Sequence, residues 1–124
     1  MALTEATPAY EPVATTVELT DGVGTDPLAW LNATPTGTEC WFWEIPDDDS
    51  SWVGLGSVST ATFTGQRRFV EAAELATDLL SDLVVEAPDE APLPRLAAGF
   101  AFEPDGGDGA WRGLGGGRLV LPSL

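Results

Sequence analysis

The chain has 124 residues, enough for one domain with a hydrophobic core, and its 44% hydrophobic content excludes a disordered polypeptide. Twenty acidic residues oppose five arginines, giving a net charge of −15, and both histidine and lysine are absent. This charge excludes nucleic acids and anionic membranes as partners, since binding to either requires cations. The dispersed acids are typical of a halophilic, cytosolic protein, and an acidic module for a basic partner is the other interpretation.

Two further features of the sequence concern its single cysteine and its cellular location. Cys40 is the single cysteine, so no disulfide forms within the chain, and without a histidine to activate it we expect a small buried side chain rather than a nucleophile. No apolar run has the length of a membrane span, and the N-terminus lacks the features of a signal peptide. We therefore expect a cytoplasmic location.

The first third of the chain predicts a flexible tail, a strand and a short helix. Residues 1–12 are rich in Thr, Ala, Glu and Pro and predict a flexible tail before a domain over 13–124. Alternation over 13–19 indicates a strand, and the glycines that follow indicate a turn. Asp26 followed by Pro27 is a helix start, which predicts a short helix over about 27–32.

Three of the five tryptophans lie in two short runs, on either side of the polar segment 47–51. Trp41 and Trp43 are separated by one residue, so a strand directs both indoles to one face, and Trp52 opens the second run. The polar segment between them predicts a turn. We expect a β-hairpin whose second strand reaches about residue 58, and at most 63, with an aromatic face that begins the hydrophobic core.

The clearest helical pattern lies in the middle of the chain. Apolar residues recur every three or four positions, which predicts one long amphipathic helix over about 66–83, with acids on the opposite face. The expected apolar stripe is Phe69, Ala72, Ala73, Ala76, Leu79, Leu80 and Leu83. A Pro- and acid-rich linker at 87–94 follows it.

The last third predicts two strands separated by a glycine-rich loop. The strand over 96–102 has one bulky face and one nearly bare face at Ala97, Gly99 and Ala101, which permits close approach of a neighbouring element. The strand over 118–122 is apolar and almost ends the sequence, and such an unprotected edge indicates the front part of something larger. Together the elements predict an α+β fold with a mainly antiparallel sheet.

No motif in the sequence identifies a catalytic residue. The glycine-rich segments 54–56 and 113–117 do not complete a nucleotide-binding loop, because Ser59 and Arg118 occupy the position of the third glycine. Without histidine or lysine, neither a Ser/His or Cys/His pair nor a Schiff base can form.

Two sets of acidic residues are weighed as candidate sites. The aspartates at 47–49 lack the glycine and the distal glutamate of an EF-hand calcium loop, so we expect a solvated hairpin turn. Sequence separation does not give the distance between Glu44 and Glu103, so a carboxylate pair of this kind stays open.

Several short motifs follow one another from about residue 13 onward. They are Asp-Pro-Leu-Ala-Trp-Leu at 26–31, Trp-Phe-Trp-Glu-Ile-Pro-Asp at 41–47, Gly-Leu-Gly at 54–56, Arg-Phe at 68–69, Gly-Phe-Ala-Phe-Glu-Pro at 99–104, Trp111 and Leu-Val-Leu-Pro at 119–122. In this order the chain resembles the N-terminal region of menaquinone-type isochorismate synthases, in a haloarchaeal-like form. These enzymes belong to the chorismate-utilising family.

The resemblance implies two packed β-sheets flanked by helices, built jointly by an N-terminal and a C-terminal half. It also implies Mg²⁺-dependent conversion of chorismate to isochorismate by attack of an activated water. The family's lysine base, general-acid glutamate and Mg²⁺ ligands all lie in the C-terminal half, so the resemblance assigns no catalytic, cofactor-binding or metal-binding residue to this chain. We accordingly expect no cofactor in this chain, and Mg²⁺ in the complete enzyme.

Two functional interpretations follow. The first is an N-terminal portion of isochorismate synthase, inactive alone, whose partner is the missing C-terminal half or a second subunit; residues beyond this chain then decide between isochorismate and salicylate as product. The alternative is a self-standing acidic α+β module that binds a protein partner without catalysis.

Overall fold

The computed structural model describes residues 3–4, 11–19 and 24–124, and within these ranges the fold is α+β. The helices are α1 (Pro27–Ala33) and α2 (Arg68–Asp82), and two 3₁₀ turns are η1 (Pro46–Asp48) and η2 (Gly109–Leu114). The strands are β1 (Leu3–Thr4), β2 (Val13–Thr15), β3 (Cys40–Ile45), β4 (Ser50–Leu55), β5 (Ser59–Phe63), β6 (Val84–Glu86), β7 (Ala97–Phe100) and β8 (Gly117–Leu121).

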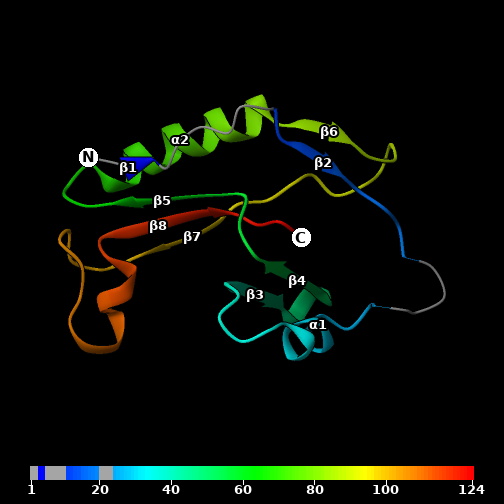
Figure 1. Cartoon of the computed structure of the whole chain (residues 1–124), viewed down its shortest axis with the longest axis horizontal. Coiled ribbons are helices and arrows are strands. Elements are labelled where there is room, and N and C mark those ends of the chain that lie inside the picture. The colour runs from blue at the N-terminus through cyan, green and yellow to red at the C-terminus, as the bar shows by residue number, and fades with distance from the viewer. Residues whose placement is uncertain (1–2, 5–10, 20–23) are drawn as a thin grey trace.

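The main sheet has four antiparallel strands in the order β1-β5-β8-β7. Helix α2 lies on one side of this sheet, and the hairpin of β3 and β4 lies with α1 on the other (Figure 1). A small parallel pair of β2 and β6 departs from the antiparallel pattern. The expected strand over 13–19 is thus shorter than predicted, and β6 was not predicted at all.

The hydrophobic core lies between α2 and the main sheet. Its buried cluster is Ala61, Phe63, Ala72 and Leu119, with Leu75, Ala76, Leu79, Leu96 and Phe100 packed around it. Complete burial of a large side chain such as Phe63 contributes roughly 1.5–3 kcal/mol. The buried face of α2 is rotated from the predicted stripe, since Phe69, Ala73 and Leu80 are exposed and Leu75 packs inward.

Strand β8 is central, so the prediction that the last strand forms an unprotected edge is wrong. It lies between β5 and β7, and Leu119, Val120 and Leu121 are buried. A strand with neighbours on both sides and cover on both faces reads as a continuous apolar run, which explains its sequence. Among the described residues, the edge strands of the main sheet are instead the two-residue β1 and β7.

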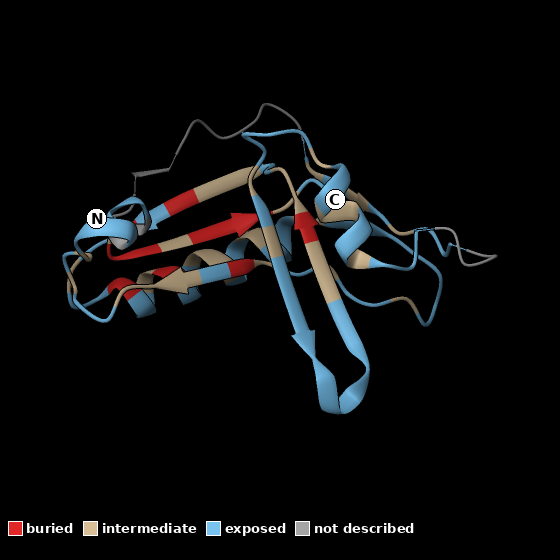
Figure 2. Cartoon of the chain, turned by 90° about the horizontal axis from the view of Figure 1, so that it is seen from below, coloured by how far each residue is buried: buried red, intermediate tan, exposed pale blue. Residues whose placement is uncertain are grey.

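The predicted hairpin is confirmed, with Trp43 opposite Trp52 and Trp41 opposite Gly54. Its second strand ends earlier than expected, because Gly56 turns the chain at a φ of +65° and β5 joins the main sheet. The prediction that its aromatic face begins the core is also wrong. Most of the hairpin is exposed (Figure 2), and Trp43 is 66% exposed, because the ribbon extends beyond the sheet that would cover it.

The predicted start of α1 is confirmed. Asp26 is the N-cap, and its carboxylate accepts a hydrogen bond of 2.9 Å from the Leu28 N–H, with Pro27 at the first helical position. Within the predicted tail, residues 3–4 pair with β5 as β1, and residues 1–2 and 5–10 lie outside the described part, as does the predicted turn at 21–22. No helix of the described residues is long and apolar enough to span a membrane.

Candidate functional site

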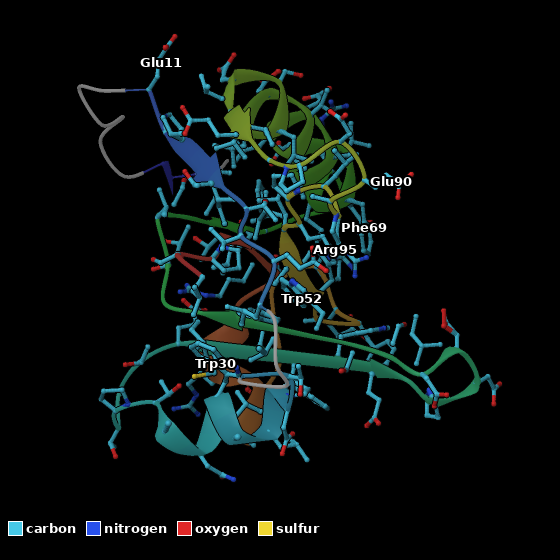
Figure 3. All side chains as sticks on the ribbon, turned by 90° about the vertical axis from the view of Figure 1, so that its right-hand side faces the viewer. Glu11, Trp30, Trp52, Phe69, Glu90 and Arg95 are labelled. Carbon is cyan, nitrogen blue, oxygen red and sulfur yellow. The ribbon has the colours of Figure 1, made fainter. Side chains whose placement is uncertain are left out.

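An aromatic groove of about 280 Å³ separates the hairpin from the start of β7. It contains three tryptophans from the hairpin and one basic residue from the chain before β7; Trp52 and Arg95 both border this space in Figure 3. Its lining is Trp41, Phe42, Trp43, Trp52, Arg95, Leu96, Ala97 and Ala98. Large aromatic surfaces of this kind, left half open, are typical of contact with another molecule.

Strand alternation positions the tryptophans. The register places Trp41, Trp43 and Trp52 on the hairpin face that turns toward the main sheet. Trp41 lies over the predicted bare face of β7, where a methyl group on Gly99 would lie 3.7 Å from its ring. At this distance the methyl group would be in ordinary van der Waals contact with the ring, so a small residue is sufficient for the indole to pack here.

The base of the hairpin is fixed to the end of the chain. A methyl group on Gly54 would lie 2.8 Å from Cγ of Pro122, so the glycine lets the two segments touch. The Leu55 N–H donates to the Leu124 carbonyl at 2.9 Å, and the Ser123 N–H donates to the Leu55 carbonyl at 3.0 Å. The distal half of the hairpin therefore projects from a well-anchored base.

An ion pair links the hairpin to the central strand. Arg118 of β8 donates from Nε to Oε1 of Glu39 at 2.8 Å and from its terminal nitrogen to Oε2 at 2.9 Å. These bonds from Arg118 hold the pKa of Glu39 below its usual range, although partial burial opposes the shift. The buried indole N–H of Trp41, which has no hydrogen bond of ordinary geometry among the described residues, adds a smaller lowering of the same pKa.

A second arginine, Arg68, lies on the opposite side of the sheet. Arg68, only 5% exposed at the start of α2, donates to the carbonyls of Gly65 at 3.1 Å and of Ala101 and Phe102 at 3.2 Å each. Its guanidinium also lies 4.3 Å from the ring centre of Phe69. The side chain thus ties the N-terminus of α2 to the turn that follows β7.

A second, shallower hollow lies between α1 and the hairpin. Trp30, Ala33, Thr34, Pro35, Thr38, Leu55 and Gly56 line it. The indole N–H of Trp30 is already used, since it donates to the Gly24 carbonyl at 2.7 Å. The hollow is apolar and brings no ionisable side chains together, so it offers no chemistry beyond packing.

The sequence-predicted candidates occupy ordinary structural positions. The expectation that Cys40 is buried is wrong: the thiol is exposed at the start of β3, where it donates to the Thr38 carbonyl at 3.4 Å. The aspartates at 47–49 form the hairpin turn as predicted, with Asp49 at a φ of +48°. Glu44 and Glu103 are both exposed, on the hairpin and on the turn after β7.

Sequence reasoning missed the side chains that tie the layers of the fold together. Glu39 carries no motif, Arg68 entered only as part of the Arg-Phe motif at 68–69, and Arg118 was considered only as the residue that breaks a glycine pattern. An arginine within an otherwise apolar strand was the available signal, because such a charge needs a partner when it is removed from water. Its partner is 79 residues away in the sequence, which no local pattern reveals.

The comparison with protein families decides the affiliation of the chain. The sequence profile of the family described as chorismate binding enzyme matches residues 3–124. The chain belongs to the chorismate-binding enzyme family. Neither the curated proteins nor the solved structures gave a match.

Membership of the chorismate-binding family confirms the predicted chorismate-utilising affiliation. The matched residues include the groove, the Glu39–Arg118 ion pair and Arg68. The resemblance to isochorismate synthases implies Mg²⁺ for a complete enzyme. Among the described residues, no three acidic or cysteine side chains gather to hold a metal ion, so these residues do not fit that site and no step is assigned to the ion.

Proposed function

We propose that this chain is the N-terminal scaffold of an isochorismate synthase, an enzyme that converts chorismate to isochorismate for menaquinone biosynthesis. The observation that carries the proposal is the family match over residues 3–124. The motif order from the Asp-Pro helix start to the Leu-Val-Leu-Pro strand supports the finer assignment to isochorismate synthases.

The catalytic groups come, in this proposal, from a C-terminal half or a second subunit. The resemblance implies a lysine base, and the sequence contains no lysine. The half-open aromatic groove and the exposed Trp43 support a role in joining such a partner. We assign no catalytic, cofactor-binding or metal-binding residue to this chain.

The cellular setting belongs to the same proposal. A net charge of −15 without lysine supports a halophilic source, where salt screens the repulsion between acidic side chains. We propose a cytoplasmic location, with residues outside this chain deciding between isochorismate and salicylate as product.

The test is an assay of the purified chain with chorismate and Mg²⁺, followed by chromatographic detection of isochorismate. We expect no product above the rate of a reaction without protein, and detectable isochorismate would refute the proposal that catalysis lies elsewhere. The alternative, a self-standing acidic interaction module, predicts a monodisperse chain that unfolds in one cooperative transition. Under the scaffold proposal the isolated chain folds but is less stable than a self-standing module, because its exposed aromatic groove lacks a partner.

A further inference from the structure

The inner end of the aromatic groove, toward the base of the hairpin, has two indoles in fixed positions. The ring of Trp41 lies over Gly99 of β7, 3.7 Å from where a methyl group on that glycine would stand. The ring of Trp52 lies across Gly54, where a methyl group would meet Cη2 of the indole at 3.2 Å. Both indoles are half-buried, whereas Trp43 is 66% exposed. Contacts within the chain therefore hold a flat aromatic wall in place.

The other wall of the groove is the start of β7. Its lining side chains are Leu96, Ala97 and Ala98, so nothing bulky fills the space opposite the indoles. Ala97 is two residues before Gly99 and lies on the face of β7 that Trp41 covers. The space of about 280 Å³ is near the lower limit of ordinary ligand pockets, about 300 Å³. A flat aromatic wall opposite small side chains, at this size, fits a planar ligand of one or two fused rings.

Arg95 supplies a positive charge to the groove. Its side chain is exposed and lines the groove, on the same side of the molecule as Trp52 (Figure 3). Among the residues that the structure describes, Arg95 makes no ion pair or hydrogen bond, whereas Arg68 and Arg118 both have partners. A guanidinium binds a carboxylate through two parallel N–H bonds. An uncommitted guanidinium beside an aromatic slot therefore selects a ligand that carries a carboxylate.

The negative charge of the whole chain does not exclude an anionic ligand. The net charge of −15 repels anions at long range, but the screening length falls to about 3 Å at 1 M salt. Contact with Arg95 at hydrogen-bonding distance survives such screening better than repulsion from distant acids does. Glu44 follows Trp43 in β3, so strand alternation directs its side chain to the other face of the hairpin. Among the described lining residues Arg95 is the charged one, which favours a carboxylate over an ammonium group.

We propose that the inner end of the groove binds a small aromatic carboxylate, a planar anion of one or two fused rings. The ring system packs between the two indoles and the start of β7, and the carboxylate accepts hydrogen bonds from Arg95. The lining residues include no catalytic group, so this site binds its ligand without converting it. The inference does not rest on the proposed function, whose partner polypeptide can contact the exposed Trp43 while a small ligand occupies the inner end.

The test uses naphthoate as the probe and the ¹⁵N-labelled 124-residue chain in about 1 M KCl. Nuclear magnetic resonance follows the indole N–H signals, and Trp30 is the internal control because it lines the other hollow and donates to the Gly24 carbonyl. We expect saturable shifts at Trp41 and Trp52 with a Kd of about 1 mM or below, and no shift at Trp30. Naphthalenemethanol and naphthylmethylammonium, which have the same rings without the carboxylate, should bind at least fivefold more weakly.

Matched variants separate the contact to the carboxylate from the contact to the rings. Arg95→Gln should weaken naphthoate binding at least fivefold and leave naphthalenemethanol binding unchanged, because it removes only the charge. Arg112→Gln, at an exposed arginine outside the groove lining, should change neither. Trp52→Leu should weaken the binding of both probes at least fivefold, because it removes part of the aromatic wall. Since Arg95 is exposed, its variant should fold as the native chain does.

Several outcomes would overturn the inference. The first is the absence of saturable shifts at Trp41 and Trp52 up to ~10 mM naphthoate. Equal or tighter binding of the neutral or the cationic probe would overturn it, as would unchanged naphthoate affinity in Arg95→Gln or an equal shift at Trp30. The binding assay contains no chorismate, so isochorismate formation by the chain alone would refute the proposed function without changing this result. Failure of naphthoate to bind would leave the proposed function unaffected.

Discussion

Glu39 and Arg118 show how one side-chain pair sets the position of a whole hairpin. Glu39 immediately precedes β3, and Arg118 belongs to the central strand, so their two bonds attach the base of the hairpin to the centre of the main sheet. Both side chains remain about a quarter exposed, at 26% and 28%. Water screens such a pair, which limits its contribution to about 1 kcal/mol.

The pair predicts a pH-dependent difference between the native chain and Glu39→Gln. The pKa of Glu39 is lower when folded, so the stabilisation is fully present above its ordinary pKa of 4.5 and disappears as the pH falls through the folded pKa. In urea unfolding near pH 7, the free energy of unfolding of Glu39→Gln should be about 1 kcal/mol lower than that of the native chain. This difference should vanish in acid. A difference that stays constant down to about pH 2 would contradict the assigned ion pair.

Gly54 predicts a second residue-scale effect. Gly54→Ala places a methyl group 2.8 Å from Cγ of Pro122, and overpacking of this kind costs about 1–3 kcal/mol. Gly113→Ala is the matched control, because nothing lies within 4 Å of a methyl group there. Thermal unfolding of both variants measures the difference, and equal stability would show that the hairpin base does not pack on Pro122.

At the scale of elements, Arg68 joins α2 to the turn after β7. Arg68→Leu leaves three carbonyls without their donor, and the loss of buried partners costs about 2–3 kcal/mol. Arg67→Ala, an exposed neighbour, is the control and should change stability by about 0.5 kcal/mol or less. Hydrogen exchange should also accelerate at residues 101–103 in Arg68→Leu; unchanged exchange there would argue against this role of Arg68.

Local patterns predicted some elements well for identifiable reasons. The Asp26-Pro27 cap and the alternation around Trp41 act through neighbours in sequence, so the start of α1 and the existence of the hairpin could be predicted. The buried face of α2 could not be predicted, because apolar residues extend beyond the expected stripe to Val70 and Leu75, and only the sheet decides which of them are covered. Phe69 was therefore assigned to the core, although it lies at the margin of the sheet.

At the scale of the whole molecule, the aromatic site was only half predictable. Sequence alternation gathered the tryptophans on one face, but it did not show whether this chain covers that face. The same limit affected the last strand: an apolar run fits a central strand and an exposed edge equally well, and pairing with both β5 and β7 decides for the centre. The motif order identified the family because it depends on many positions at once.

The central claim is that this scaffold functions as part of a larger chorismate-utilising assembly. The most direct test is the native mass of the species that carries this segment in its own cell extract, measured by size fractionation and an antibody to the segment. We predict a species several times heavier than 13.0 kDa that forms isochorismate from chorismate. A stable 13.0 kDa monomer as the only form would contradict the account.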